Sequence, residues 1–242
     1  MASIWTVGDI HGEAARLKAL LTALPRRPDD TTVFLGDYID RGPDSAAVVR
    51  CILAEHDAAP DRTVLLWGNH EDMAAHTFKV PYPSGIKYDP YDWFRNGGIQ
   101  TMESYGSPVP AMFGAPCPDD IARLLGLLRT FWRAEEPALA PVIWVHAGVL
   151  PGKQPEDCTG ETLVWVRDEF LNVWDQSGRV VIHGHTPARE VKRLKDKIGM
   201  DTGAVFGGLL SALQIPESGL DDARLYQTDR RGRTISLLLP GR

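Results

Sequence analysis

The sequence predicts an α/β protein in which two β-sheets stack face to face inside outer layers of helices. Strand alternates with helix through about residue 76, which indicates an α/β protein, and β-prone runs outnumber helical segments, which favours two stacked sheets over a single doubly wound sheet. A third observation concerns function, because five of these runs end in loops rich in Gly, His, Asp or Asn. Ligands of α/β proteins bind at the carboxyl ends of strands, so these loops are the expected site.

The first three strands are short runs of mostly Val, Ile, Leu, Trp, Phe or Thr, as expected of buried strands. The run SIWTV is followed by GDIHG and by a predicted helix over residues 13–24, whose leucines recur at helical spacing. TTVFL is followed by GDYIDRG, and Pro43 and Asp44 then open a second predicted helix. TVLLW is followed by GNHE.

Residues 77–118 interrupt this alternation with many prolines and aromatic residues. We expect a loop-rich insertion, in which Gly97 and Gly98 allow unusual backbone angles and residues 99–105 form a helical turn. A loop of this length in a compact domain is usually functional. Its aromatic residues have two interpretations, as the wall of a substrate groove or as a satellite core.

The rest of the chain predicts one long helix and several strands. The helix is expected over residues 120–134, with a buried face that includes Phe131 and Trp132. VIWV and RVVI are predicted strands that end in HAGV and HGHT, a further strand is expected just before Asp201, and 224–227 and 234–239 are expected to be closing strands. Between them, residues 205–215 form a run of small and apolar residues. We expect a single domain over residues 1–242.

Composition disfavours several classes of protein. A net charge of −6 disfavours binding to nucleic acid or anionic membranes, and no apolar run approaches the ~20 residues of a membrane span. Cys51, Cys117 and Cys158 show no C-x-x-C spacing, so we expect reduced cysteines rather than disulfides or a zinc knuckle. The amino terminus lacks the pattern of a secretion signal. We therefore expect a soluble, cytoplasmic protein and leave its oligomeric state open.

The loops after the strands contain residues that bind metal ions. Their Asp, His and Asn side chains offer oxygen and imidazole nitrogen without thiolate, which favours Mn²⁺, Fe or Zn over a Cys₄ zinc site or a Ca²⁺ cage. More than four candidate ligands imply two ions. The alternative is that these residues cap helices or complete turns, but capping alone does not select histidine.

The chain resembles the phosphoprotein phosphatases in five motifs that occur in the same order: GDIHG at 8–12, GDYIDRG at 36–42, GNHE at 68–71, HAG at 146–148 and GHT at 184–186. HGHTP and the run MDTGAVF at 200–206 resemble the bacterial and phage serine/threonine phosphatases of this family, of which the bacteriophage lambda enzyme is one. The resemblance implies the calcineurin-like metallophosphoesterase fold, a four-layer α/β/β/α sandwich with two mixed sheets.

The resemblance also implies a set of metal ligands. Asp9 and His11 would bind one ion, Asp37 would bridge both ions, and the second ion would be held by Asn69, His146 and His185. His183, the last residue of its strand, is expected to be structural rather than a ligand. Asp201 has two interpretations, as a turn residue or as a hydrogen-bond partner of a ligand histidine.

A catalytic dyad and a phosphate clamp follow from the same resemblance. Two nearby cations lower the pKa of a shared water to give a bridging hydroxide, which would attack phosphorus. His70 and Asp40 would form the dyad, because an imidazolium oriented by a carboxylate is a sound general acid for a leaving alkoxide. Arg41 and, on a shorter match, Arg167 would bind the phosphate oxygens through bidentate hydrogen bonds.

The first hypothesis is therefore a metal-dependent serine/threonine protein phosphatase that acts on phosphoproteins or phosphopeptides and tolerates phosphotyrosine. Its cofactors would be two divalent ions, Mn²⁺ first, with Fe or Zn as alternatives. Two departures leave the substrate open: Trp67 stands where many family members have Arg, and HAG replaces the HGG of eukaryotic members, as in the symmetrical diadenosine tetraphosphatase branch. The second hypothesis is a hydrolase of dinucleoside polyphosphates, and the third is a non-catalytic scaffold with this fold.

Overall fold

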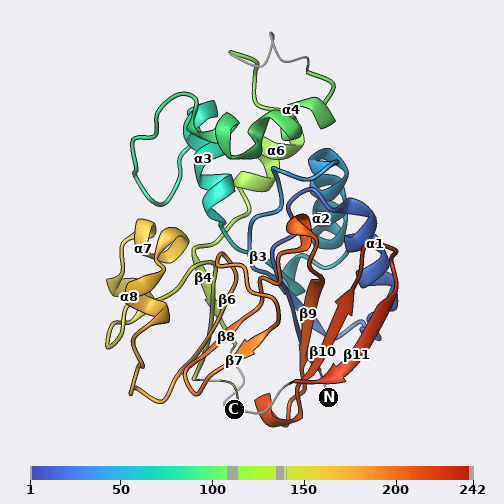
Figure 1. Ribbon diagram of the computed structural model, residues 1–242, viewed down its shortest axis with the longest axis vertical. Helices are drawn as coiled ribbons and strands as arrows, with labels where there is room; N and C mark the ends of the chain where they lie inside the picture. Colours follow the sequence, from blue (N-terminus) through green and yellow to red (C-terminus); the bar gives the residue numbers. More distant parts are fainter. Residues whose placement is uncertain (1, 108–113, 135–138, 140, 240–242) are drawn as a thin grey trace.

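Two mixed β-sheets form the centre of the computed structural model, which describes residues 2–107, 114–134, 139 and 141–239 (Figure 1). The six-stranded sheet has the order β11-β10-β9-β1-β2-β3, and the five-stranded sheet has the order β4-β5-β6-β8-β7. In the first sheet β1, β2 and β3 pair in parallel. On the other side of β1, β9 pairs antiparallel with β1, β10 with β9 and β11 with β10. In the second, β5, β6 and β8 are parallel and both edge strands are antiparallel. The predicted fold class is confirmed.

The strands are short, and most are buried. Those of the first sheet are β1 (Ile4–Val7), β2 (Thr31–Phe34), β3 (Thr63–Leu65), β9 (Leu210–Ile215), β10 (Arg224–Thr228) and β11 (Thr234–Leu238). Those of the second sheet are β4 (Phe131–Arg133), β5 (Val142–Val145), β6 (Val180–His183), β7 (Lys192–Arg193) and β8 (Lys197–Gly199).

Helices cover the outer faces of the two sheets and their upper end in Figure 1. On one side lie α1 (Ala14–Ala23) and α2 (Ser45–Ala58), and on the other lie α7 (Gly160–Trp165) and α8 (Asp168–Leu171). The upper end carries α3 (Asn69–Phe78), η2 (Phe94–Gly98), α4 (Ile99–Ser104) and α6 (Asp119–Leu125). Short turns complete the fold at η1 (Pro60–Arg62), η4 (Pro155–Asp157), η5 (Ala204–Phe206) and η6 (Leu220–Asp222).

Three hydrophobic clusters correspond to the three interfaces between four layers. The first joins α1 and α2 to the outer face of the six-stranded sheet, for example through Leu17 and Val49 with Phe34. The second lies between the sheets and includes Val33 and Trp144. The third joins the five-stranded sheet to α7 and α8. The period-two alternation of the strands assigns neighbouring residues to different clusters, so the layers follow from the sequence pattern.

The helix expected over residues 120–134 is wrong in its second half. Helix α6 ends at Leu125, and Phe131–Arg133 forms β4, which pairs antiparallel with β5. A run this short fits helical and strand spacing equally well, and pairing with a distant strand decides between them. Among the described residues, no helix is both long and apolar enough to span a membrane.

The segment expected to be a loop-rich insertion contains the irregular helix η2 and α4 between its loops, while its residues 108–113 lie outside the described part of the chain. Most of its described aromatic residues pack into the first hydrophobic cluster, with Trp93 and Phe94 fully or almost fully buried, whereas Tyr91 is half exposed. Gly97 has a φ of 115° and packs against the backbone of Arg41. Of the two interpretations of these aromatic residues, the core role therefore holds, although the core is the main one and not a satellite. The segment also contacts the GDYIDRG loop through Gly97.

Candidate metal and phosphate site

The six predicted metal ligands meet at the carboxyl ends of strands from both sheets. Asp9 and His11 follow β1, Asp37 follows β2 and Asn69 begins α3 just beyond β3. From the second sheet, His146 follows β5 and His185 follows β6. All six side chains are buried. Five loops that lie far apart in the sequence thus form one cluster, because parallel strands bring their carboxyl ends to the same edge.

Asp37 occupies the centre of this cluster. Its Oδ2 atom lies 3.3 Å from Nε2 of His11, and its Oδ1 atom lies 3.4 Å from Nε2 of His146. Asp37 belongs to both groups of side chains whose ligand atoms converge closely enough for an ion, one with His11 and His70 and the other with His146 and His185. A carboxylate shared by two groups has the placement that a bridging ligand requires.

Asn69 and Asp9 both contact residues of the second group, which consists of Asp37, His146 and His185. Oδ1 of Asn69 lies 2.9 Å from Nδ1 of His185 and 3.1 Å from Nε2 of His146. Asp9 falls outside both converging groups, and its Oδ2 accepts the backbone N–H of His185 at 2.9 Å. Its Oδ1 is buried without a hydrogen-bond partner among the described residues. The predicted ligands thus lie in one cluster, but His70, and not Asp9, belongs to the first group.

Backbone carbonyls orient two of the imidazoles toward Asp37. Nδ1 of His11 lies 2.9 Å from the carbonyl oxygen of Ile39, and Nδ1 of His146 lies 2.8 Å from that of Leu35. A proton held on Nδ1 by a carbonyl leaves Nε2 as the free ligand atom, which is the usual arrangement of metal-binding histidines.

The loops allow this close approach through glycine and through unusual backbone angles. A Cβ atom on Gly184 would lie 2.0 Å from Oδ1 of Asp9, and one on Gly68 would lie 2.2 Å from Oδ1 of Asp37. Among the described residues, six that are not glycine have a positive φ, and five of them are His11, Asp37, Asp40, Arg41 and His185. Strained backbone angles of this kind cluster at functional sites.

Charges in the cluster shift the protonation of its members. Burial, with the nearby carboxylates of Asp201 and Asp37, raises the pKa of Asp9 well above its ordinary value. Burial alone would also raise the pKa of Asp37, but the surrounding histidines hold that pKa well below its ordinary value. Burial lowers the pKa of His146 and brings that of His185 to about 2. Both imidazoles are therefore neutral at pH 7, the form that binds metal.

The donor set fits divalent cations. Carboxylates, imidazoles and one amide converge without a thiolate, and a buried carboxylate oxygen of Asp9 has no hydrogen-bond partner in the described structure. Buried carboxylates that lie beside one another need compensating positive charge. Oxygen and imidazole donors suit Mn²⁺, Fe or Zn.

The predicted dyad is formed. Nδ1 of His70 lies 2.6 Å from Oδ2 of Asp40, and both side chains are almost completely buried. Burial lowers the pKa of His70, while the carboxylates of Asp37 and Asp40 oppose that shift. Nε2 of His70 is buried without a hydrogen-bond partner among the described residues, so this atom is available to a bound molecule.

Three site residues were not predicted from the sequence: Glu71, Trp93 and Thr101. Trp93 donates its indole N–H to Asp40, with distances of 2.9 and 3.1 Å to the two oxygens, and Thr101 donates its hydroxyl to Oδ1 at 2.6 Å. Glu71 accepts the backbone N–H groups of residues 37, 38, 39 and 68, and so holds the GDYIDRG loop in place. The fourth letter of GNHE is a signal that could have identified Glu71.

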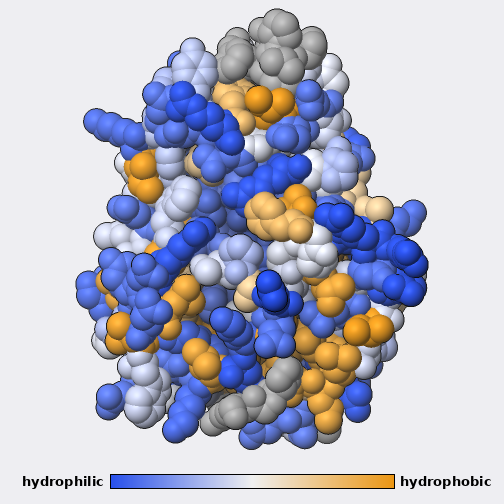
Figure 2. Space-filling view, viewed as in Figure 1, coloured by the Kyte–Doolittle hydropathy of each residue, from blue (hydrophilic) through white to orange (hydrophobic). Residues whose placement is uncertain are grey.

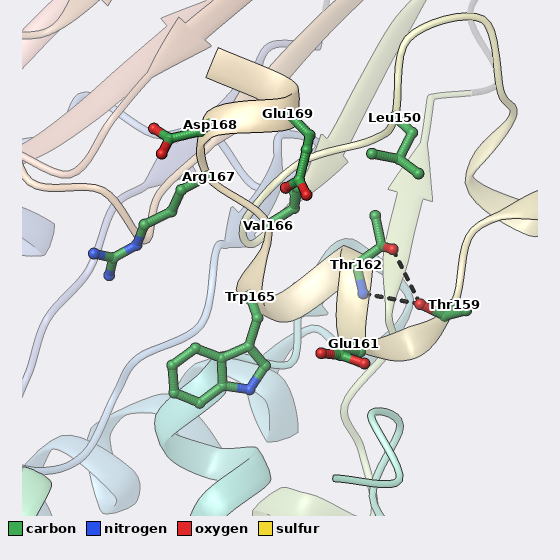
Figure 3. A pocket seen from close by; sticks show the side chains of 9 residues that line it. All are labelled: Leu150, Thr159, Glu161, Thr162, Trp165, Val166, Arg167, Asp168 and Glu169. Atoms are coloured by element: carbon green, nitrogen blue, oxygen red, sulfur yellow. Dashed lines mark hydrogen bonds between the residues drawn. The ribbon is translucent and has the colours of Figure 1, made fainter. Parts of the chain in front are cut away.

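The two predicted phosphate-binding arginines contact histidines of different converging groups. Nη1 of Arg41 lies 2.8 Å from Nε2 of His11, and Nε of Arg167 lies 3.0 Å from Nε2 of His185. In Figure 3 the guanidinium of Arg167 points away from the carboxylates of Glu161 and Glu169, which line a cavity of about 500 Å³ beside α7 and α8. Each arginine therefore contacts a candidate metal ligand rather than a surface carboxylate.

The remaining polar candidates surround the cluster. His183 lies outside both converging groups, with Nδ1 3.0 Å from the carbonyl oxygen of Gly184 and its ring edge-on to Phe170. Asp201 accepts the backbone N–H of Gly203 at 2.9 Å, as expected of a turn residue.

Comparisons with known proteins agree with this geometry. The family model described as calcineurin-like phosphoesterase matches residues 2–189. Serine/threonine-protein phosphatase 1 of Salmonella typhimurium is 29% identical over 221 residues, which cover 88% of this chain and 91% of that protein. The symmetrical bis(5'-nucleosyl)-tetraphosphatase of Bordetella parapertussis is 30% identical over 271 residues, covering 90% and 94%. The crystal structure of a cold-active protein-tyrosine phosphatase from Shewanella has a TM-score of 0.59 at 17% identity, covering 97% and 80%, which shows the shared fold.

Proposed function

Because the chain belongs to the calcineurin-like phosphoesterase family, we propose that it removes phosphate from phosphoserine and phosphothreonine side chains in proteins. The observation that carries this proposal is the contact of 2.6 Å between Nδ1 of His70 and Oδ2 of Asp40, beside the central Asp37. An alkoxide leaving group needs a proton, and a buried His–Asp pair next to the reacting phosphate can supply it. Phosphotyrosine would be a further substrate, since its leaving group needs that proton less.

Each part of the proposed reaction has residues that perform it. Two divalent ions, when bound, would activate water and neutralise charge on the phosphoryl group. The residues that would hold them are Asp9, His11, Asp37, Asn69, His146 and His185. Asp40 orients the imidazole of His70, whose Nε2 delivers the proton to the leaving oxygen. Arg41 and Arg167, each within hydrogen-bonding distance of a candidate ligand, bind the phosphate oxygens.

Hydrolysis of dinucleoside polyphosphates is the second candidate, and Trp67 is the observation that favours it. This side chain precedes GNHE, is only 7% exposed and packs into the first hydrophobic cluster. The phosphate contact that many related protein phosphatases make with Arg at this place is therefore either missing or supplied by another residue. The Bordetella relative is named for hydrolysis of such a dinucleotide.

A substrate panel separates the candidates. The protein, loaded with Mn²⁺, is given phosphoserine and phosphothreonine peptides, p-nitrophenyl phosphate and diadenosine tetraphosphate. The first proposal predicts the highest kcat/KM for the phosphopeptides. A strong preference for the dinucleotide would replace it with the second candidate, and a protein that binds no Mn²⁺ and hydrolyses nothing would be the scaffold.

A further inference from the structure

Phe206 presents an exposed aromatic ring on a turn that is firmly held. The ring is 63% exposed, and Figure 2 shows an isolated hydrophobic patch, bordered by hydrophilic side chains, at the position of η5 in Figure 1. Beneath the turn, the buried Arg16 donates Nη1 to the carbonyl oxygens of Ala204 and Gly208, both at 2.9 Å. An apolar ring fixed in contact with water is a preorganised binding surface.

The ring of Phe206 lies directly beside the candidate phosphate site. The guanidinium carbon of Arg41 lies 5.4 Å from the centroid of the Phe206 ring, and Nη1 of the same side chain lies 2.8 Å from Nε2 of His11. One guanidinium thus separates the ring from the metal-binding cluster. A phosphate held by Arg41 places its substituent next to Phe206.

The space beside this pair is a cavity whose lining includes polar groups. It has a volume of about 580 Å³, within the ~300–1,000 Å³ typical of small-molecule sites, and its lining includes Arg41, Phe206, Asn96 and Gln100. Asn96 donates one N–H of its amide to the carbonyl oxygen of Asp92 at 2.8 Å, which leaves its second N–H and its Oδ1 for a ligand, and the amide of Gln100 also carries donors and an acceptor. The cavity therefore combines a cation, an aromatic face and amides.

We propose that this cavity binds the nucleoside part of a nucleoside phosphate, with the base stacked on Phe206 and its polar edge facing Asn96 and Gln100. The inference rests on the phosphohydrolase function proposed above and gives the second candidate a substrate-binding residue. A tyrosyl ring would also stack on Phe206, but it has no polar edge to pair with the two amides. A nucleobase satisfies the ring and the amides together.

Calorimetric titration of the Mn²⁺-loaded protein with adenosine 5'-monophosphate and ribose 5-phosphate tests this proposal, because the two ligands differ only in the base. We expect the nucleotide to bind more tightly, by about five- to a hundredfold, the usual effect of stacking one base on an aromatic side chain. The substitution Phe206→Ala should weaken nucleotide binding and remove the part of this difference that stacking provides. Phe206→Trp should preserve the difference.

A matched control is Trp174→Ala, since Trp174 is similarly exposed, at 57%, but lies outside the cavity. It should leave the difference between the ligands intact. Equal affinities in the natural protein, or a difference that Phe206→Ala leaves undiminished, would overturn the proposal. Binding of the base and release of phosphate are separate readouts, so a protein that binds the base and hydrolyses no phosphate would refute the proposed function alone.

Discussion

The indole nitrogen of Trp93 lies 2.9 Å from Oδ2 of Asp40, the same oxygen that lies 2.6 Å from Nδ1 of His70. Thr101 donates to the other carboxylate oxygen of Asp40. Trp93 and Thr101 both come from the segment between α3 and α6, so this segment supports the dyad as well as the core. The packing of this segment therefore fixes the position of Asp40, and through Asp40 it fixes the imidazole of His70 that is proposed to transfer a proton.

Replacing His70 by Asn should reduce turnover of p-nitrophenyl phosphate or a phosphopeptide by about 10²–10⁴, because the leaving oxygen would lose its proton donor. Metal content, measured by elemental analysis, should stay unchanged. His56→Asn is the control, since His56 lies on α2 away from the cluster. Turnover that survives in His70→Asn would exclude the acid role.

Removing the hydroxyl of Thr101 should impair the dyad without changing side-chain shape. In Thr101→Val, Asp40 loses a partner for its Oδ1 and for its backbone N–H. We expect kcat to fall by about tenfold, as is usual for residues that orient a catalytic group, and the free energy of unfolding to fall by about 1–3 kcal/mol. Thr101→Ser keeps the hydroxyl and should behave like the natural protein; equal losses in both variants would contradict this account.

Metal ions should stabilise the fold, because the cluster gathers buried carboxylates around Asp37. Adding Mn²⁺ to protein treated with a chelator should raise Tm, and free Mn²⁺ at a hundred times its Kd corresponds to about 2.7 kcal/mol. Asp37→Asn should lose most of this shift in differential scanning calorimetry. The exposed Asp61→Asn serves as a control, and a Tm insensitive to Mn²⁺ would argue against a metal centre.

Asp30 should make stability depend on pH far from the site. Burial alone would raise the pKa of its carboxyl, but hydrogen bonds from the backbone N–H groups of Ser3 and Arg27 and from the indole of Trp5 lower it. A folded pKa below the unfolded value of about 3.9 gives stability that is present at neutral pH and is lost as pH falls through the folded pKa.

Asp30→Asn should therefore lower the free energy of unfolding by about 1–3 kcal/mol at pH 7, and by progressively less below about pH 4. Urea unfolding at several pH values measures the difference. Asp29→Asn is the matched control, because its exposed neighbouring carboxyl makes no comparable set of hydrogen bonds in the described structure. A destabilisation that is the same at pH 3 and pH 7 would contradict the prediction.

The layers and the residues that converge on Asp37 could be predicted because their signals are local. Each candidate ligand stands next to a strand whose alternation is visible in the sequence, and parallel strands place such loops at one edge. Phe131 and Trp132 were assigned to a helix because three residues of β4 are too few to define a period. Their pairing with β5 makes them a strand, and the three residues alone do not show which distant strand they pair with.

Trp93 and Thr101 could not be predicted because their partner lies far away along the chain. Thr101 and Asp40 are 61 positions apart, and Trp93 and Asp40 are 53 apart. Tryptophan and threonine suit a hydrophobic core as well as a hydrogen bond to a carboxylate. Only the folded arrangement of α4 and η2 shows which role they have.

The five site residues with positive φ also set a limit on how heat-resistant an active form of this protein can become. Side chains other than glycine in that region raise the energy of the folded chain by about 1–3 kcal/mol each. Glycine at Asp40 or Arg41 would relax the backbone while removing a group proposed to act on the substrate. Selection for stability alone would therefore drift toward glycine in this loop and toward an inert protein, whereas selection for turnover keeps the less stable sequence.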